Sequence, residues 1–139
     1  MTSAVLLCLA LSSFCVITHY EMLRLLNDYL GNTTVMAERP KVLAALSGGV
    51  VSHLLQISVF AVSYYWLRDR LGLGGFGGTF EDSMASFMYF SIETYTTLGF
   101  GDIYPVGPLR MVCGIESLIG LLMISWTASF TYLEMRRHW

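Results

Sequence analysis

Apolar residues fall into three long runs, and most charged residues lie between the runs or at their ends. The first run covers residues 1–18 without a charge and continues, past a few polar positions, to residue 26. The second covers residues 42–67, and the third runs from about residue 109 to 133 with one acid, Glu116. At about 1.5 Å per residue, a helix of each length crosses a hydrocarbon core of about 30 Å. The pattern therefore predicts three membrane-spanning helices.

A shorter apolar and aromatic segment, residues 84–95, lies between the second and third runs. It is too short to span a bilayer. Asp82 and Ser83 precede it, and short oxygen-bearing side chains cap the first turn of a helix. The glycine-rich residues 72–78 before it predict a flexible surface loop. Irregular backbone at membrane depth is tolerated only where protein buries it or water lines it, so residues 98–102 need a special environment after a re-entrant helix.

Composition fits a membrane protein. The chain has 139 residues, of which 55% are hydrophobic and 13% charged, and its mean hydropathy is +0.59. A soluble protein carries about 25% charged residues, so the bilayer is the expected solvent. The net charge of −2 argues against a nucleic-acid partner, which requires a basic face. Cys8, Cys15 and Cys113 all lie in apolar runs and are expected to be buried hydrophobes, not a disulfide framework or a metal site.

The first run could instead be a signal peptide, because its length also suits the apolar part of one. No Lys or Arg precedes it, however, and no small-residue cleavage site closes it before Arg24. We therefore expect a retained helix.

The distribution of basic residues predicts the orientation. Five lie at one end of the spans (Arg24, Arg39, Lys41, Arg136 and Arg137), and three lie at the other (Arg68, Arg70 and Arg110). Because cytoplasmic segments carry more Lys and Arg, we expect the N-terminus outside and the C-terminus cytoplasmic. The expected location is the cell membrane, inner or plasma.

The heptapeptide Thr-Thr-Leu-Gly-Phe-Gly-Asp at residues 96–102 resembles the selectivity filter of tetrameric potassium channels, usually written TTVGYGD. The order of span, short helix, filter and span is similar to that family as well. The resemblance implies an all-α membrane protein: a homotetramer around a four-fold axis, with three transmembrane helices and a re-entrant pore helix per chain. It divides the chain into an extra helix with a cytoplasmic connection, 1–40, and a pore domain, 41–139. Within the pore domain it places the outer helix at 42–68, the pore helix at 82–95, the filter at 96–102 and the inner helix at 108–135.

By this resemblance, carbonyl oxygens of Thr97, Leu98, Gly99 and Phe100 coordinate K⁺. A dehydrated cation needs rings of oxygen dipoles in place of water. Backbone carbonyls supply such rings if they all point inward, and glycines allow backbone angles that other residues rarely adopt. Thr97 would also offer its hydroxyl as the innermost ring. Four chains are needed, since one strand cannot encircle an ion.

Six further residues are expected to support this filter: Glu93, Thr96, Gly101, Asp102, Tyr89 and Phe90. The resemblance implies that Glu93 shares a proton or a hydrogen bond with Asp102. Leu98 and Phe100 replace the family's valine and tyrosine, so bracing would rest on packing among Phe100, Tyr89 and Phe90. The lost tyrosine hydrogen bonds, about 1 kcal/mol each, should loosen the filter. Potassium selectivity is the expectation, and a weakly selective monovalent cation channel is the alternative.

Gating candidates follow from the third span. Gly120 lies near the position where family members carry a hinge glycine. Glu116, an acid at membrane depth, either hydrogen-bonds the back of the pore helix or a neighbouring subunit, or takes part in gating or proton sensing. No span carries Arg or Lys at every third position, which excludes an arginine-rich voltage sensor. Gating is then left to the filter, the inner helices, lipid, pH or a separate regulatory partner.

His19, Glu21 and His53 form a second polar group within the spans. His19 and His53 could meet if the first two spans pack side by side. They then form either an ordinary hydrogen bond between helices or a pH sensor, since histidine titrates near neutrality. The residue spacing does not support a metal site.

Two other classes of function compete with a channel. Gly99 to Asp102 also fits the Gly-x-Gly-Asp pattern of intramembrane aspartyl proteases, but that chemistry needs a second aspartate at the same site. No Asp lies within another span, so we do not expect an enzyme. A non-conducting membrane subunit is the other class, and it has no need to retain Thr97, Gly99 and Gly101 together.

Overall fold

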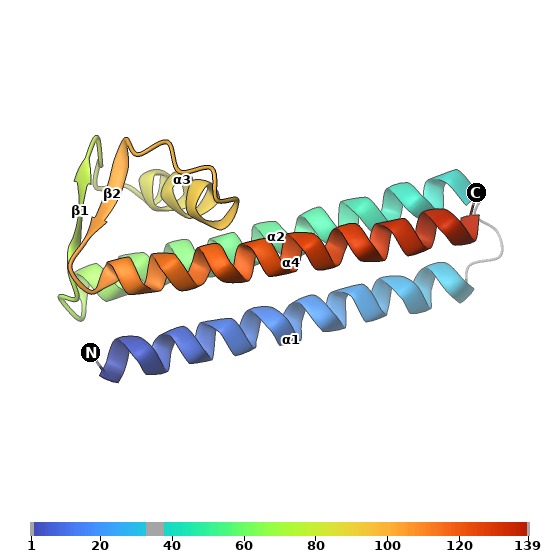
Figure 1. Cartoon of the computed structure of the whole chain (residues 1–139), viewed down its shortest axis with the longest axis horizontal. Coiled ribbons are helices and arrows are strands. Elements are labelled where there is room, and N and C mark those ends of the chain that lie inside the picture. Colours follow the sequence, from blue (N-terminus) through green and yellow to red (C-terminus); the bar gives the residue numbers. More distant parts are fainter. Residues whose placement is uncertain (1, 33–37, 139) are drawn as a thin grey trace.

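Three long helices run side by side in the computed structural model, which describes residues 2–32 and 38–138 (Figure 1). Their bounds are Thr2–Asn32 for α1, Glu38–Asp69 for α2 and Leu109–His138 for α4. Each contains an apolar stretch long enough to cross a membrane. The three predicted spans are therefore present. The N-terminus and the C-terminus lie at opposite ends of the bundle.

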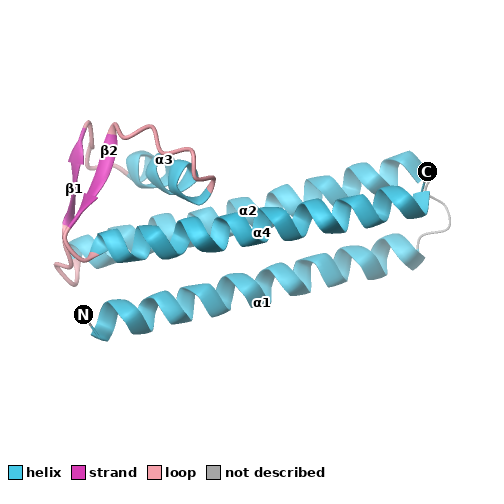
Figure 2. Ribbon diagram, viewed as in Figure 1, coloured by secondary structure: helices cyan, strands magenta, loops and turns pink. Residues whose placement is uncertain are grey.

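The segment between α2 and α4 forms a separate layer. It contains strand β1 (Gly75–Gly78), helix α3 (Met84–Tyr95) and strand β2 (Ile103–Val106). Figure 2 shows α3 and the two strands on one side of α2 and α4, with α1 on the other. Helix α3 packs against α2 and α4, as the predicted re-entrant helix should, and it spans only part of the bundle's length.

The glycine-rich residues 72–78 form the predicted loop only as far as residue 74. Residues 75–78 form β1, which pairs with β2 in an antiparallel hairpin with Phe76 opposite Pro105. The glycines allow this close approach: a Cβ added at Gly78 would lie 1.9 Å from the carbonyl oxygen of Asp102. Phe76 then anchors the strand by stacking on Phe80, with ring centroids 4.9 Å apart.

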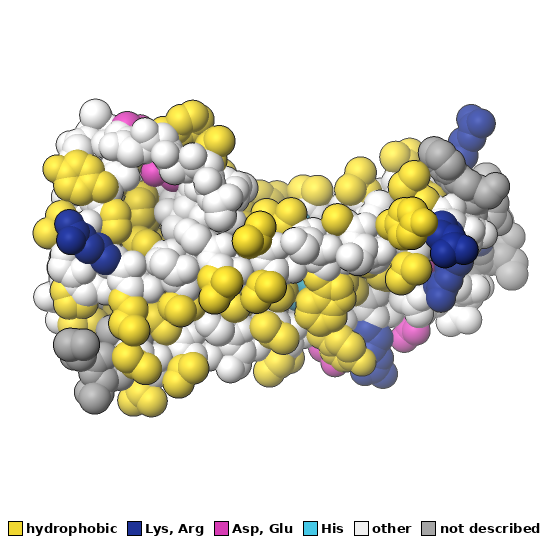
Figure 3. Space-filling view, viewed as in Figure 1, with side chains coloured by type: hydrophobic (Ala, Val, Ile, Leu, Met, Phe, Trp, Pro, Cys, Tyr) yellow, Lys and Arg dark blue, Asp and Glu magenta, His cyan; other side chains and the backbone are white. Residues whose placement is uncertain are grey.

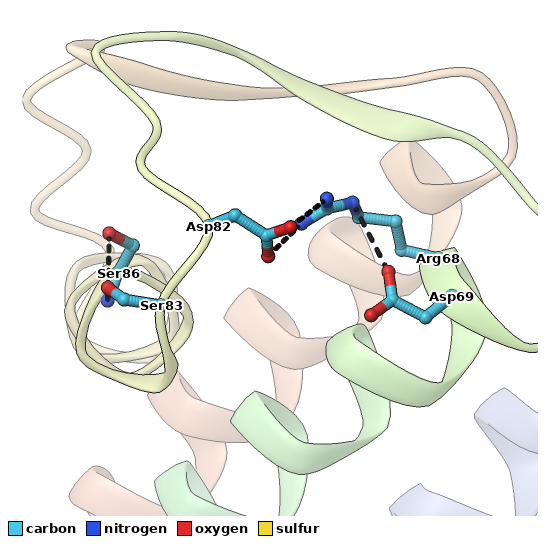
Figure 4. Close-up of polar contacts among 5 residues, drawn as sticks. All are labelled: Arg68, Asp69, Asp82, Ser83 and Ser86. Atoms are coloured by element: carbon cyan, nitrogen blue, oxygen red, sulfur yellow. Dashed lines mark hydrogen bonds and ion pairs between the residues drawn. The ribbon is translucent and has the colours of Figure 1, made fainter.

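Ser83 caps α3 as expected, because its side chain accepts a hydrogen bond from the amide of Ser86 at 3.2 Å. Asp82 does not share this role. It pairs instead with Arg68 at the end of α2, whose two terminal nitrogens each lie 2.8 Å from a carboxylate oxygen (Figure 4). The Arg68 guanidinium also lies over the Phe80 ring, 5.1 Å from its centroid. This ion pair ties the start of α3 to α2.

The Arg68–Asp82 pair should make stability depend on pH. Hydrogen bonds from Arg68 hold the pKa of Asp82 below its usual range. The pair therefore stabilises the fold above the ordinary carboxyl pKa, and the contribution is lost as pH falls through the lowered value. Asp82→Asn should lower the thermal unfolding temperature slightly at neutral pH and have no effect in strong acid. Glu81→Gln is the control for the loss of one nearby charge, and an equal effect of the two variants would contradict the pairing.

The outer surface of the spans is apolar, as the sequence predicts for contact with lipid. Figure 3 shows hydrophobic side chains along the middle of the bundle and basic side chains at its two ends. Leu6 and Leu43, for example, are 66% and 63% exposed. Cys8, Cys15 and Cys113 are buried and free, as expected of small hydrophobes.

Candidate functional site

Four successive amide groups, at residues 97–100, donate hydrogen bonds to the C-terminal end of α3. Thr97 donates to the Thr94 carbonyl at 3.1 Å, Leu98 and Gly99 donate to the Glu93 carbonyl at 2.9 and 3.3 Å, and Phe100 donates to the Glu93 carboxylate at 3.3 Å. The segment after α3 is therefore held along its whole amide side by the helix it has just left.

These amides determine where the carbonyl groups point. In a trans peptide the C=O of one residue is antiparallel to the N–H of the next, and no described peptide bond is cis. The carbonyls of Thr96, Thr97, Leu98 and Gly99 consequently point away from α3. The last three belong to the set predicted to coordinate an ion. The Phe100 carbonyl is not oriented by these bonds, and its role remains a prediction.

Left-handed backbone at alternate positions makes this arrangement possible. Thr97, Gly99 and Gly101 have φ values of +60°, +54° and +80°. In an ordinary extended strand, successive residues face opposite sides, whereas alternation in the sign of φ turns successive carbonyls to one side. The two glycines were expected to serve this purpose. Thr97 was not, because a β-branched residue rarely adopts positive φ and no local sequence signal predicts it.

The predicted packing of Phe100 on Tyr89 and Phe90 is wrong within the chain. Phe100 is 66% exposed. Phe90 instead lies in an aromatic cluster behind the filter segment, with its ring centroid 4.9 Å from Phe76 and 5.3 Å from Tyr64. The hairpin, which the sequence did not predict, supplies Phe76 as a partner for Phe90.

The predicted link between Glu93 and Asp102 is also replaced by other partners. The Glu93 carboxylate accepts from the Phe100 amide, and Asp102 accepts from the Tyr89 hydroxyl at 3.1 Å. Glu93 is 3% exposed. Burial raises the pKa of Glu93, with a further rise from the charge of Asp102, against the opposing effect of the Phe100 amide. Glu93 thus supports the filter segment directly through a hydrogen bond, and Asp102 affects it only by charge repulsion.

Glu116 makes the contact with the back of the short helix that was expected of it. It is fully buried and accepts hydrogen bonds from Ser91 on α3, at 2.5 Å, and from Tyr64 on α2. The sequence did not indicate the Tyr64 contact, because Tyr64 and Glu116 lie on different spans, 52 residues apart. Glu116 therefore joins three helices, and its gating role remains a prediction.

Gly120 has a packing reason to be glycine. A Cβ added there would lie 2.0 Å from the carbonyl oxygen of Tyr95, the last residue of α3. The inner helix and the end of α3 meet backbone to backbone at this point. A hinge at Gly120 stays untested.

The two histidines meet, as the side-by-side packing of the first two spans requires. The ring centroids of His19 and His53 are 5.3 Å apart. Glu21 does not belong to this group: it is exposed and pairs with Arg24 at 3.5 Å. Within residues 2–32 and 38–138 no group of three or more potential ligands could hold a metal ion.

The sequence missed four polar residues that surround these histidines: Ser52, Gln56, Tyr95 and Thr127. Ser52 and Gln56 lie four residues apart on α2, a spacing that places them on one helix face. That spacing within an apolar run was the available signal.

The pore-loop class of ion channel is defined by a short helix that lies between two spans in the chain and packs against both. An extended segment follows this helix, and its carbonyls point away from the helix. The chain belongs to the ion channel family whose model matches residues 52–135, which is more than half of its length. Membership favours a channel over the intramembrane protease considered above.

A curated relative extends this comparison. The inward rectifier potassium channel Kirbac3.1 of Paramagnetospirillum magnetotacticum is 30% identical over 86 residues. The aligned part covers 61% of this chain and 28% of the relative. The chain thus spans little more than a quarter of the length of that protein.

Proposed function

We propose that the protein conducts K⁺ selectively and passively across the membrane through residues 96–102 of four identical chains. The observation that carries this proposal is the set of carbonyls at residues 96–99, which four amide bonds turn away from α3. Oxygen dipoles fixed in this way can replace the hydration shell of a cation. The motif's resemblance to the potassium-channel filter and the potassium channel among its relatives support K⁺ as the ion.

The exposure of two filter side chains supports assembly into a homotetramer. Leu98 and Phe100 are 58% and 66% exposed in the single chain, although both are large and apolar. A groove of about 340 Å³ also lies beside the filter, with Gly99 and Gly101 among its lining residues. Neighbouring copies would cover these surfaces, and four strands around one axis would complete the carbonyl rings.

Electrostatics favour a cation at this site. The C-terminal end of α3 carries the negative end of the helix dipole and lies next to the filter. Asp102 and Glu81 line a hollow on the outer side of α3, where they should raise the local concentration of cations. The excess of basic residues at the opposite end of the bundle supports a cytoplasmic C-terminus in the cell membrane.

A reversal-potential measurement tests the proposal. The purified chain is reconstituted into lipid bilayers with mixed solutions, rich in K⁺ and poor in Na⁺ on one side and the reverse on the other. A reversal potential near the K⁺ equilibrium value is expected. A value near zero would instead support the weakly selective alternative, which the replacements at Leu98 and Phe100 favour. Absence of current from an assembled tetramer would overturn both.

Glu93 should control the stability of the conducting filter. Glu93→Ala removes the acceptor of the Phe100 amide, a partly buried hydrogen bond worth about 1 kcal/mol per chain. We expect the current to decay faster during sustained conduction. The decay in the wild type should also change as pH falls through the raised pKa of Glu93.

Glu93→Gln is the matched control, because it keeps an acceptor oxygen but does not titrate. It should conduct with decay that is independent of pH. Identical decay in the wild type and in Glu93→Ala at every pH would contradict this role.

A further inference from the structure

A closed ring of side-chain hydrogen bonds joins all four helices inside the bundle. Its members are His19 on α1, His53 and Gln56 on α2, Tyr95 on α3 and Thr127 on α4. Thr127 Oγ1 lies 3.2 Å from His19 Nε2 and 2.9 Å from His53 Nε2. On the other side, the Tyr95 hydroxyl lies 2.9 Å from His53 Nδ1 and 2.6 Å from Gln56 Oε1. The ring closes between Gln56 Nε2 and His19 Nδ1, which are 3.1 Å apart.

The amide of Gln56 sets the direction of every bond in this ring. Its Nε2 can only donate, so in the ring His19 Nδ1 accepts from it and His19 donates from Nε2 to Thr127. The Ser52 hydroxyl lies 3.0 Å from the same Nδ1 and can donate to it as well. Its Oε1 can only accept, so Tyr95 donates to it and receives a bond from His53 Nδ1. Thr127 in turn donates to His53 Nε2. Both histidines are therefore neutral and in opposite tautomers, with the proton on Nε2 of His19 and on Nδ1 of His53.

This ring ends at the base of the filter. Tyr95 is the last residue of α3 and precedes Thr96 and Thr97 directly, and it is fully buried. His19 and Gln56 are also fully buried. Because α1 lies on the far side of α2 and α4 from the filter (Figure 1), His19 gives this extra helix a hydrogen-bonded connection to the end of α3.

An added proton cannot be accommodated without breaking the ring. On His19 Nδ1 it would break the bond from the Gln56 amide, donor against donor, and the Ser52 hydroxyl at 3.0 Å would accept in its place. On His53 Nε2 it would force Thr127 to turn and stop donating. The other titratable groups near the ring are Cys15 on α1 and Glu116 on α4, which interact with Tyr95. Glu116 is already bound by Tyr64 and Ser91, and no described ring member donates to a carboxylate.

The ring is accessible from one side of the bundle. A groove of about 370 Å³ lies between α2 and α4, and His53 and Thr127 line it among mainly apolar residues. In hydrocarbon no bulk water replaces a broken hydrogen bond. A proton that enters by this groove therefore opens the ring and frees the Tyr95 hydroxyl.

Building on the proposed channel function, we propose that His19 is a positioning residue for the filter and that proton uptake by the ring reduces K⁺ conduction. The neutral ring holds Tyr95, and with it the first filter residues, in the conducting arrangement. The protonated ring releases them. Helix α1, which lies outside the two-helix pore, thereby controls the rate of K⁺ conduction through the filter.

K⁺ flux from vesicles tests this proposal with two variants at His19. In the wild type, flux should fall at least about tenfold when the pH is lowered from about 8 to about 4, a span that extends below the range in which free histidine titrates. His19→Gln keeps a donor and an acceptor but does not titrate, so it should conduct at high pH and lose much of the acid response. His19→Leu removes both bonds and should give low flux at every pH. An unchanged acid response in His19→Gln would overturn the proposal.

Thr18→Val is the matched control on α1. The Thr18 hydroxyl bonds carbonyls of its own helix, Phe14 and Cys15, so its loss should leave both the flux and its pH dependence unchanged. A Thr18→Val phenotype equal to that of His19→Leu would reduce His19 to a general role in helix packing and so overturn its positioning role.

Nitrogen-15 NMR of the histidine rings separates this proposal from the channel assignment. In a His138→Gln background only His19 and His53 remain of the three histidines. At high pH the spectrum should show one ring protonated on Nε2 and the other on Nδ1. The predicted tautomers without any K⁺ flux would leave the ring in place and overturn the proposed function. Two identical tautomers, or a charged ring at high pH, would overturn the ring itself.

Discussion

Gly99→Ala should abolish K⁺ conduction without preventing insertion of the chain into the membrane. Gly99 has a φ of +54°, in the left-handed region. An L-residue with a Cβ costs about 1–2 kcal/mol there, and four chains would incur this cost around one ring. Relief of the strain would rotate the adjoining peptide and turn carbonyls out of the row that the amide bonds to Glu93 maintain. K⁺ flux and the assembly state should be measured on the same vesicles.

Gly75→Ala is the control for that experiment. Gly75 lies in β1, has no positive φ, and has no atom within 4 Å of an added Cβ. It should conduct like the wild type. Selective K⁺ current from Gly99→Ala would show that residues 96–102 are not the filter.

Gly120→Ala should both destabilise the protein and stop conduction. The added Cβ would lie 2.0 Å from the Tyr95 carbonyl oxygen, closer than real Cβ atoms come to other atoms. Overpacking of this kind costs about 1–3 kcal/mol, and here the obstructing atom belongs to backbone. Either α4 or the end of α3 must shift, and the filter begins at the next residue after Tyr95. Thermal unfolding and K⁺ flux together measure both effects.

Gly114→Ala provides a matched comparison on the same helix. Within the chain, an added Cβ at Gly114 has no atom within 4 Å. Its unfolding temperature should therefore remain close to that of the wild type. If Gly120→Ala unfolds at the same temperature as Gly114→Ala, the close contact between α4 and Tyr95 does not exist in the membrane.

The spans, the short helix and its cap could be predicted from the sequence because each depends on neighbouring residues. Long apolar runs suffice for three helices, and α3 follows from a run too short to cross. Ser83 caps α3 because its side chain lies within reach of the Ser86 amide. The filter motif at residues 96–102 is likewise contiguous, and its two glycines at 99 and 101 do take the left-handed backbone expected of them.

Apart from the positive φ of Thr97, the errors concern contacts that the chain makes only after it has folded back on itself. Five glycines within residues 72–78 indicate flexibility, but residues 75–78 pair with β2, and Phe76 stacks on Phe80. That hairpin then gives Phe90 an aromatic partner, Phe76, that the sequence did not indicate. Glu93 and Asp102 were matched by resemblance, yet the turn after α3 brings the Phe100 amide to Glu93 and the Tyr89 hydroxyl to Asp102.

The sequence alone therefore determined that the chain crosses a membrane, where its helices lie and which segment carries the carbonyls. Hydropathy and backbone freedom are properties of single residues and short runs, so they can be read without a fold. The tertiary structure alone decided that His19 connects with Tyr95, because five polar groups on four helices become partners only when the helices pack. No neighbouring residue in the sequence marks any of these five groups, so their closed ring could not be predicted before the helices were placed.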